Sequence, residues 1–265
     1  ALLEVRLATY LAGRVELGST GTVRIPPANL RALSSDFTFA CHSRRMLAWQ
    51  ERFMQTDLET SIFTIVVLIF SIIIHEVAHG YAANSLGDPT AKLSGRLTMN
   101  PLPHIDPIGS VLLPGLLVLT GAGMLFGWAK PVPYNPYNLK SQRWGEAVVG
   151  IAGVATNLLL AVLFSIIAKV SYASGAPLFG DLSAIVVYVN LFLGLFNLIP
   201  FPPLDGFTVL RGILPGRYAM SLRHLEERFL GGGMFSLLLF LIVFSYFFVQ
   251  PFAQFVLSIF RFLLF

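Results

Sequence analysis

Charged side chains are scarce in this sequence, because only 12% of its 265 residues are Asp, Glu, Lys or Arg, against about 25% in soluble globular domains. Hydrophobic residues make up 55% of the chain, and the mean hydropathy is +0.72. The formal charge of +4 comes from Lys and Arg residues in loops between apolar runs, where they are typical topology signals and not a nucleic-acid-binding surface. The composition predicts an integral protein of the lipid bilayer with no nucleic-acid partner.

Cysteine is almost absent as well. The single thiol, Cys41, cannot form an intrachain disulfide, and the sequence has no Cys-x-x-Cys pair that could hold a metal ion through thiolates. The sequence therefore excludes a disulfide-stapled fold and a thiolate metal site.

Long apolar runs divide the chain into two parts. Residues 1–57 form an N-terminal arm with seven arginines and no run long enough to span a membrane, and we assign it no function. Residues 58–265 form the predicted membrane domain, an all-α helical bundle of four to six membrane segments. The first run covers about 34 Å at about 1.5 Å per residue. The predicted spans are 62–84, 147–170, 182–199 and 234–249, and residues 252–265, beyond Pro251, are a short fifth span or an interfacial tail.

A broken apolar stretch, residues 108–126, contains Pro114, Gly115, Gly121 and Gly123. The loops on both sides of it carry Lys and Arg, which predicts a cytoplasmic location for both loops. The stretch must then enter the membrane and return, as a re-entrant loop. Broken backbone at that depth is tolerated where it packs against protein or lines a wet cavity.

The sequence His75-Glu76-Val77-Ala78-His79 lies at the inner end of the first span. Histidines four residues apart lie on one helix face, where both can bind one ion, and the adjacent glutamate can act as a base toward water. A third protein ligand would leave one zinc position open, as in hydrolases. Helix packing or a proton path is the alternative interpretation, although ionisable groups inside a membrane helix usually mark a functional site.

Asp205 is the leading candidate for the third ligand. Prolines at 200, 202 and 203 end the preceding helix, and Gly206 permits a tight turn that directs the carboxylate inward. A loop aspartate that caps the next helix is the ordinary alternative. His104 and Asp106 are rival ligands, but we expect them to fix the loop that leads into the re-entrant stretch.

Together these motifs resemble the site-2 protease family of intramembrane metalloproteases, in its compact bacterial type without PDZ or CBS domains, over about residues 58–230. The resemblance rests on the His-Glu-x-x-His motif, on residues 127–133, on Gly153 to Asn157, and on the segment from Asn197 to Gly206. It implies that one Zn²⁺ per chain is held by His75, His79 and Asp205. It also implies that Asn197 lies near the scissile carbonyl, while Asn157 is open to either a catalytic or a helix-packing role.

The resemblance predicts regulated intramembrane proteolysis of membrane-spanning substrates, such as anti-sigma factors or remnant signal peptides. The expected location is the bacterial inner membrane, with the active site near the cytoplasmic side. Stretch 108–126 and the loop to Pro133 are a candidate edge for pairing with an extended substrate. The alternatives are a metal or ion transporter, whose polar residues should be spread along several spans, and a substrate-binding protein that has lost catalysis.

Overall fold

A computed structural model describes residues 16–17, 23–24, 58–112 and 129–264 of the chain. Residues 57–264 form one compact unit, and residues 1–56 belong to a second one. Within the second unit, the described residues are two short antiparallel strands, β1 (Glu16–Leu17) and β2 (Val23–Arg24). The described part of the larger unit contains helices and loops but no strand.

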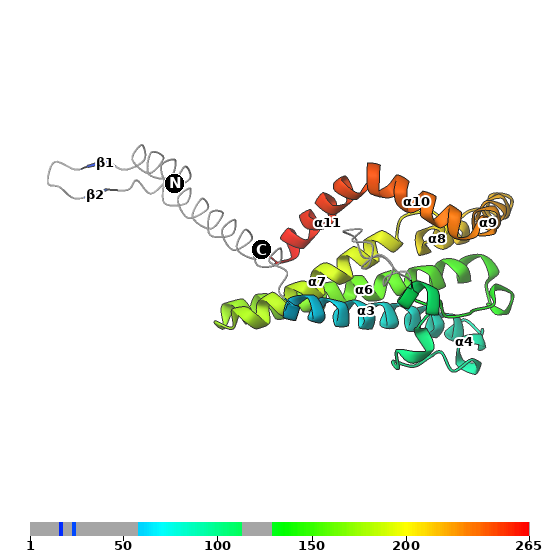
Figure 1. Cartoon of the computed structure of the whole chain (residues 1–265), viewed down its shortest axis with the longest axis horizontal. Helices are drawn as coiled ribbons and strands as arrows, with labels where there is room; N and C mark the ends of the chain where they lie inside the picture. Colours follow the sequence, from blue (N-terminus) through cyan, green and yellow to red (C-terminus); the bar gives the residue numbers. More distant parts are fainter. Residues whose placement is uncertain (1–15, 18–22, 25–57, 113–128, 265) are drawn as a thin grey trace. The chain divides into compact units, whose positions relative to one another are not determined.

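Three helices of the larger unit are long and apolar enough to cross a membrane: α3 (Leu58–Ser85), α6 (Gln142–Ala173) and α7 (Pro177–Asn197). They lie side by side, and α6 packs against both of the others (Figure 1). These helices contain the first three predicted spans, each with slightly different ends. The prediction of an all-α integral membrane protein is therefore confirmed.

Small residues let these three helices approach closely. Ala161, Ala168 and Ala184 are fully buried in the bundle, and a Cβ on Gly194 would lie 3.2 Å from the Leu158 side chain. One polar contact also joins α3 to α7, because the Asn190 amide donates to the Ser71 hydroxyl at 3.0 Å. Small residues and occasional hydrogen bonds are the usual means of association for helices in lipid, where the hydrophobic effect does not drive them together.

The predicted re-entrant stretch lies partly outside the described residues, because 113–128 are not described. Its surroundings are described: α4 (Thr90–Leu93) and η1 (Leu102–His104) precede it, η2 (Pro107–Leu112) covers its first residues, and η3 (Pro136–Asn138) follows it. The backbone N–H of Lys130 donates to the carbonyl of His104 at 2.8 Å. The chain therefore leaves this stretch beside the point where it entered, as the re-entrant prediction requires.

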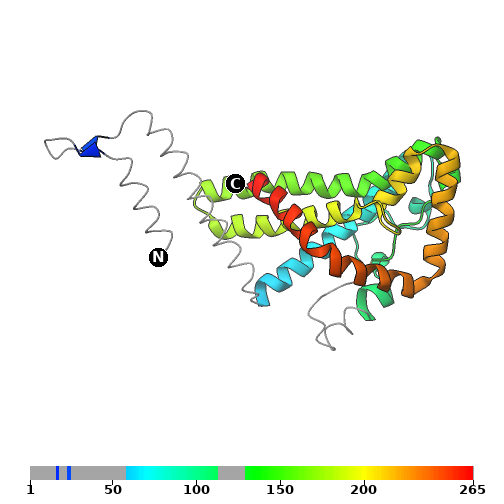
Figure 2. The same ribbon diagram turned by 90° about the horizontal axis from the view of Figure 1, so that it is seen from above.

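Four further helices follow in the described part of the unit: α8 (Asp205–Ile213), α9 (Gly216–Gly231), α10 (Gly233–Phe247) and α11 (Val249–Leu264). Helices α10 and α11 meet at a bend of 68°, and α11 packs along α7 and α6 (Figure 2). The described residues thus hold three spans, or four if the bent pair counts as one.

The predicted boundary at Pro251 is wrong, because Pro251 lies in the first turn of α11 and the break falls at Phe248. Proline is tolerated in a first turn, where its missing N–H would have no helical partner anyway. The predicted span at 234–249 corresponds to α10, which begins at Gly233 and ends at Phe247. The 15 residues of α10 cover only about 22 Å of a hydrocarbon core about 30 Å thick.

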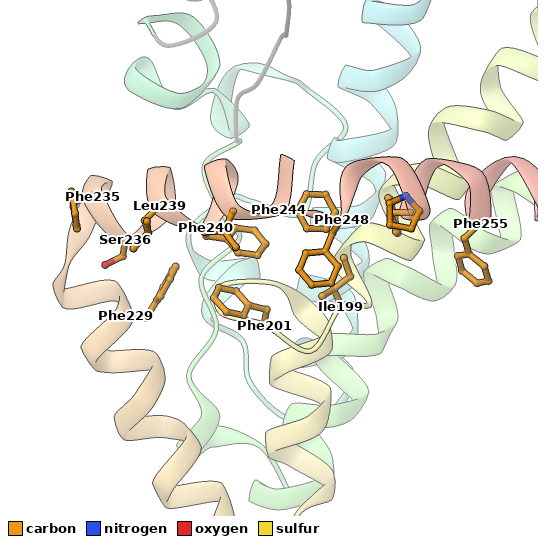
Figure 3. Close-up of a pocket in the computed structure, with 13 residues that line it drawn as sticks. Ile199, Phe201, Phe229, Phe235, Ser236, Leu239, Phe240, Phe244, Phe248 and Phe255 are labelled. Carbon is orange, nitrogen blue, oxygen red and sulfur yellow. The ribbon is translucent and has the colours of Figure 1, made fainter. Parts of the chain in front are cut away.

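Phenylalanines connect α10 to the loop that leads into α8. Phe201 stacks on Phe240, with ring centroids 4.4 Å apart, and meets Phe229 edge-on at 5.3 Å. These rings line a cavity of about 660 Å³ between the loop and the bent pair (Figure 3). Among the described residues that line it, Ser236 is the only polar one, and none of the predicted site residues is among them. The cavity is therefore apolar and separate from the predicted catalytic site.

Candidate metal centre

The two motif histidines stand on consecutive turns of α3, and both point toward α6. The His75 residue is 5% exposed, and the His79 side chain is 11% exposed. Their rings meet edge to face with centroids 4.6 Å apart, and their Nε2 atoms are 3.0 Å apart. The i, i+4 spacing thus brings both ligand atoms to one point, as a helix face requires.

Asp205 brings its carboxylate to the same point from the other side of the bundle. Helix α7 ends at Asn197, and Asp205 is the first residue of α8 after a loop that contains the three prolines. Its Oδ2 atom lies 2.8 Å from His75 Nε2 and 3.3 Å from His79 Nε2. No side chain caps the start of α8. The geometry therefore favours the ligand interpretation of Asp205 over the capping one.

Two glycines make this approach possible. A Cβ on Gly153 of α6 would lie 2.5 Å from His79 Nε2 and 2.7 Å from His75 Nε2, so only glycine leaves room for the imidazoles. A Cβ on Gly206 would lie 2.1 Å from the carbonyl oxygen of Leu198. Gly206 belongs to α8 and its φ is not positive, so the predicted reason for it was wrong. It is needed for close backbone packing, not for a tight turn.

Hydrogen bonds fix the orientation of both imidazoles. His79 Nδ1 lies 2.7 Å from the carbonyl oxygen of Val149. A carbonyl only accepts, so Nδ1 carries the proton and Nε2 presents its lone pair. His75 Nδ1 lies 2.9 Å from the Oδ1 atom of Asn157, which is fully buried. Both rings therefore present the lone pair of Nε2, the atom that can bind a metal ion, beside the carboxylate. Their Nδ1 atoms have partners of the kind that usually orient metal-bound histidines.

This donor set fits a zinc ion. His75, His79 and Asp205 each offer one ligand atom, and these atoms lie within 4.8 Å of one another. Zinc ligands at about 2.0–2.1 Å in tetrahedral geometry are about 3.3–3.4 Å apart, close to the observed spacings of 2.8, 3.0 and 3.3 Å. Two lone pairs and a carboxylate oxygen that face one another repel unless a cation lies among them. Two His and one carboxylate are a known catalytic zinc set.

Glu76 lies next to the first ligand and has a partner of its own. Its Oε2 atom accepts a hydrogen bond of 2.8 Å from the backbone N–H of Val132. Val132 belongs to residues 129–135, which have no regular secondary structure and which we call the strap. The strap therefore holds one oxygen of the carboxylate beside the proposed ligands.

The structure does not bring the other candidate residues to this centre. The Asn197 amide donates to the Leu193 carbonyl of its own helix at 3.0 Å, and no hydrogen bond joins it to the four central residues within the described chain. His104 Nε2 lies 3.0 Å from the Thr98 carbonyl, and the Asp106 carboxylate accepts from the N–H groups of Ile108 and Gly109. His104 and Asp106 thus shape the loop, as the sequence indicates.

Three partners of the centre were not assigned from the sequence. The sequence leaves Asn157 open to catalysis or packing, and the structure gives it a direct hydrogen bond to His75. The Val149 carbonyl and the Val132 N–H are backbone groups. Every residue has such groups, so no sequence signal distinguishes these two.

Comparison with known proteins agrees with this centre. A sequence model of peptidase family M50 matches residues 173–244, which include Asp205 but not the two histidines. The protein YwhC of Bacillus subtilis (strain 168), whose name describes it provisionally as a zinc metalloprotease, is 34% identical over 214 residues, which are 78% of this chain and 89% of YwhC.

Two more distant relatives carry similar names. Rip2 of Mycolicibacterium smegmatis, also provisionally named a zinc metalloprotease, is 30% identical over 54% of this chain and 53% of its own length. The zinc metalloprotease MJ0392 of Methanocaldococcus jannaschii is 28% identical over 58% of this chain and 34% of its own length. No solved structure matches the chain. The extent of the match to YwhC shows that this chain belongs to peptidase family M50, the site-2 protease family, and is a zinc metalloendopeptidase.

Proposed function

We propose that this chain is an intramembrane protease that hydrolyses peptide bonds within or near the membrane-spanning helices of other proteins. One observation carries the proposal: the His-Glu-x-x-His motif lies inside a helix long enough to span a membrane, and the carboxylate of Asp205 meets both histidines there. A metal centre in that position is within reach of a substrate held in the bilayer and out of reach of most soluble proteins.

The residues of the centre divide into metal ligands, a base and a polar group for the oxyanion. His75, His79 and Asp205 hold the metal ion. Zinc bound there supplies a Lewis acid that polarises the scissile carbonyl and lowers the pKa of water. Glu76 takes a proton from water through its carboxylate and returns it to the leaving amine. Asn197 is proposed, by family resemblance alone, to stabilise the developing oxyanion. That role needs a rearrangement of its amide, which now donates to Leu193.

The distribution of ionisable groups supports hydrolysis over transport. In the described spans, His75, Glu76 and His79 lie at one depth, while Glu59, Lys169 and Asp181 lie near the opposite helix ends. An ion path needs such groups at several depths across the membrane. Lys169 of α6 is exposed, and Asp181 lies in the first turns of α7, where it accepts a hydrogen bond from Tyr172. Neither one extends the centre into a path.

Substrates are proposed to be proteins with a single membrane-spanning helix, such as anti-sigma factors or remnant signal peptides, cut in the course of regulated intramembrane proteolysis. The strap has few donors for pairing with an extended substrate. Pro131 and Pro133 have no N–H, and the N–H groups of Lys130 and Val132 already bind His104 and Glu76. Most of the candidate edge, residues 113–128, lies outside the described part of the chain.

The proposed location is the bacterial inner membrane with the centre near the cytoplasmic side. The exposed basic residues Lys92, Lys140 and Arg217 follow the ends of α3, of the strap and of α8 respectively. Lys92 follows the end of α3 that carries His75 and His79. Basic loops remain on the cytoplasmic side of a membrane, so the centre should lie near that side.

The deciding experiment is cleavage of a model single-span substrate by the purified protein in lipid, with the cut position mapped by mass spectrometry and zinc measured in the same sample. We expect a cut inside or next to the span. Glu76→Gln should retain zinc and lose at least about 100-fold in kcat, because the amide cannot accept the proton. Full activity of Glu76→Gln would refute the mechanism, and cleavage only at soluble tails would refute the intramembrane assignment.

A further inference from the structure

Arg96 is buried in a way that its role as a topology signal does not explain. Arg96 is 6% exposed, whereas Lys92 of the neighbouring helix α4 is exposed. Exposure is what we expect of a basic residue that only marks the cytoplasmic side. No carboxylate lies within ion-pair distance of Arg96 among the described residues, and its Nε atom has no partner there. Burying a charge without a counter-ion lowers the stability of the fold. A residue kept in such a position is therefore expected to serve a function.

The guanidinium is bound to the backbone of the strap. Arg96 Nη2 donates to the carbonyl of Lys130 at 2.6 Å and to that of Pro131 at 3.2 Å. The next N–H along the chain is that of Val132, which donates to Glu76 Oε2 at 2.8 Å. The Pro131 carbonyl and the Val132 N–H belong to one planar peptide group, so Arg96 and Glu76 bind the two sides of the same unit.

A glycine turn places Arg96 where it can reach the strap. Gly95 has φ +66° after α4, the N–H of Gly95 donates to the Lys92 carbonyl, and the N–H of Arg96 donates to the Ala91 carbonyl. This is a Schellman motif. The turn after α3 has the same form, with Gly87 at φ 107° and the N–H of Asp88 on the Ala83 carbonyl.

Asp88 anchors the other end of the strap with the opposite charge. It is fully buried, and its carboxylate accepts hydrogen bonds from the Asn135 N–H at 2.7 Å and from the Asn138 amide at 2.8 Å. Burial would raise the pKa of the Asp88 carboxyl, but hydrogen bonds from Thr90, Asn138 and Asn135 hold it below its usual value. The Arg96 guanidinium therefore binds carbonyl groups near one end of the strap, and the Asp88 carboxylate binds the Asn135 N–H at the other end.

The strap itself is stiff between these two anchors. Pro131 and Pro133 fix their own φ angles and restrict the residues before them. A Cβ on Gly80 would lie 3.0 Å from the Val132 side chain, so the strap also packs tightly on α3. A shift at the Arg96 end is therefore transmitted to the Val132 N–H and is not absorbed by a flexible loop.

We propose that Arg96 is a positioning residue for catalysis: by holding the carbonyls of Lys130 and Pro131, it aims the Val132 N–H at Glu76 and so fixes the carboxylate in the orientation it needs as a base. The inference rests on the proposed function, because it assumes that Glu76 is the base. Arg96 does not touch the substrate or the metal ligands, so its removal should change kcat while zinc content and KM stay nearly constant.

The test compares four variants of the full chain in lipid: Arg96→Met, Arg96→Lys, Lys92→Met and Glu76→Gln. We expect Arg96→Met to retain zinc and to lose about 10–100-fold in kcat, the effect typical of a lost supporting hydrogen bond at a metal site. Arg96→Lys should recover part of the loss, because an ammonium group can donate to both carbonyls. Lys92→Met removes the same charge from the same loop and should match the wild type.

Hydrogen exchange gives a readout that does not depend on activity. A peptide covering residues 129–140 should exchange faster in Arg96→Met than in Lys92→Met, while peptides from α6 and α7 stay equally protected in both. Wild-type kcat in Arg96→Met, or a strap that exchanges as slowly as before, would refute the positioning role. If Arg96→Met does not fold, Arg96→Gln retains a donor for one carbonyl, and loss of zinc or of the folded state in both variants would show a purely structural role.

The outcomes also separate this inference from the proposed function. If Glu76→Gln still cleaves the substrate, the proposed function fails whatever the Arg96 variants do. If Glu76→Gln is inactive and Arg96→Met is fully active, only the role of Arg96 fails.

Discussion

The backbone N–H of Lys140 donates to the carbonyl oxygen of Leu86 at 2.9 Å. Leu86 directly follows the first span, and Lys140 directly precedes the N-terminal end of α6. The segment from Leu86 to Lys140 therefore leaves the helix bundle and returns to it at the same end. Helices α3 and α6 run antiparallel as a result, which brings the motif histidines of α3 beside residues 149–157 of α6.

This relationship predicts the sidedness of the loops in the membrane. In a Cys41→Ser background, single cysteines at Lys92, Lys140 and Arg217 should all react with a membrane-impermeant thiol reagent from the cytoplasmic side. A cysteine at Ser174, in the turn between α6 and α7, should react only from the outside. If Lys92 and Lys140 are labelled from opposite sides, both the re-entrant topology and Asp205 as a zinc ligand must be abandoned.

Removal of a ligand should remove the metal. We expect His79→Ala and Asp205→Ala to lower zinc content and activity together, because each removes one of three protein ligands. His104→Ala is the matched control, since His104 is also buried but binds only the Thr98 carbonyl through Nε2. Metal analysis of the three purified variants decides the matter. Zinc retained in Asp205→Ala and lost in His104→Ala would show that the third ligand is misassigned.

A single methyl group at position 153 should disable the centre. In Gly153→Ala the new Cβ would lie 2.5–2.7 Å from both imidazoles. The helices must then separate, at a cost of about 1–3 kcal/mol for overpacking, or the histidines must move away from Asp205. Gly216→Ala is the control, because nothing lies within 4 Å of a Cβ there. Thermal unfolding and zinc analysis should show loss in the first variant alone, and an intact zinc site in Gly153→Ala would contradict the observed packing of α3 on α6.

Asn157 should affect zinc affinity through His75. Asn157→Ala removes the acceptor for the Nδ1 proton, and we expect zinc to bind about 10–100-fold more weakly. The best control is Asn190→Ala, which removes another fully buried asparagine from the bundle. That change breaks the hydrogen bond to Ser71, a contact worth about 0.6 kcal/mol in a membrane protein, and should leave zinc affinity unchanged. Competition with a chelator measures both affinities, and equal values in the two variants would assign Asn157 to helix packing.

The sequence predicted the three long spans because apolar runs of that length have few alternatives in water or lipid. It also pointed to His75, Glu76, His79 and Asp205, since ionisable residues at one membrane depth are rare and the motif spacing is specific. The short helices α8 and α9 were not predicted, nor was the bend at Phe248. Their positions depend on contacts with α6 and on a ring cluster between distant phenylalanines, and a local pattern does not encode such contacts.

The role of Arg96 shows a second limit. A basic residue after a span predicts a cytoplasmic loop, and its sequence context does not show whether the side chain is exposed or buried. Burial here depends on the glycine turn at Gly95 and on carbonyl groups of the strap, which lies more than 30 residues further along the chain. Backbone acceptors have no residue-specific signature, so the sequence alone could not distinguish Arg96 from Lys92.

His75 and Asp205 are 130 residues apart in the sequence, yet their side chains are 2.8 Å apart. Only the fold brings two such distant ligands together, so the metal ion binds the folded chain and not the unfolded one. By mass action, free zinc at about 100 times its dissociation constant adds about 2.7 kcal/mol to the stability of the folded state. Metal supply would then govern not only how fast this protease works but also how long the protein lasts in the cell.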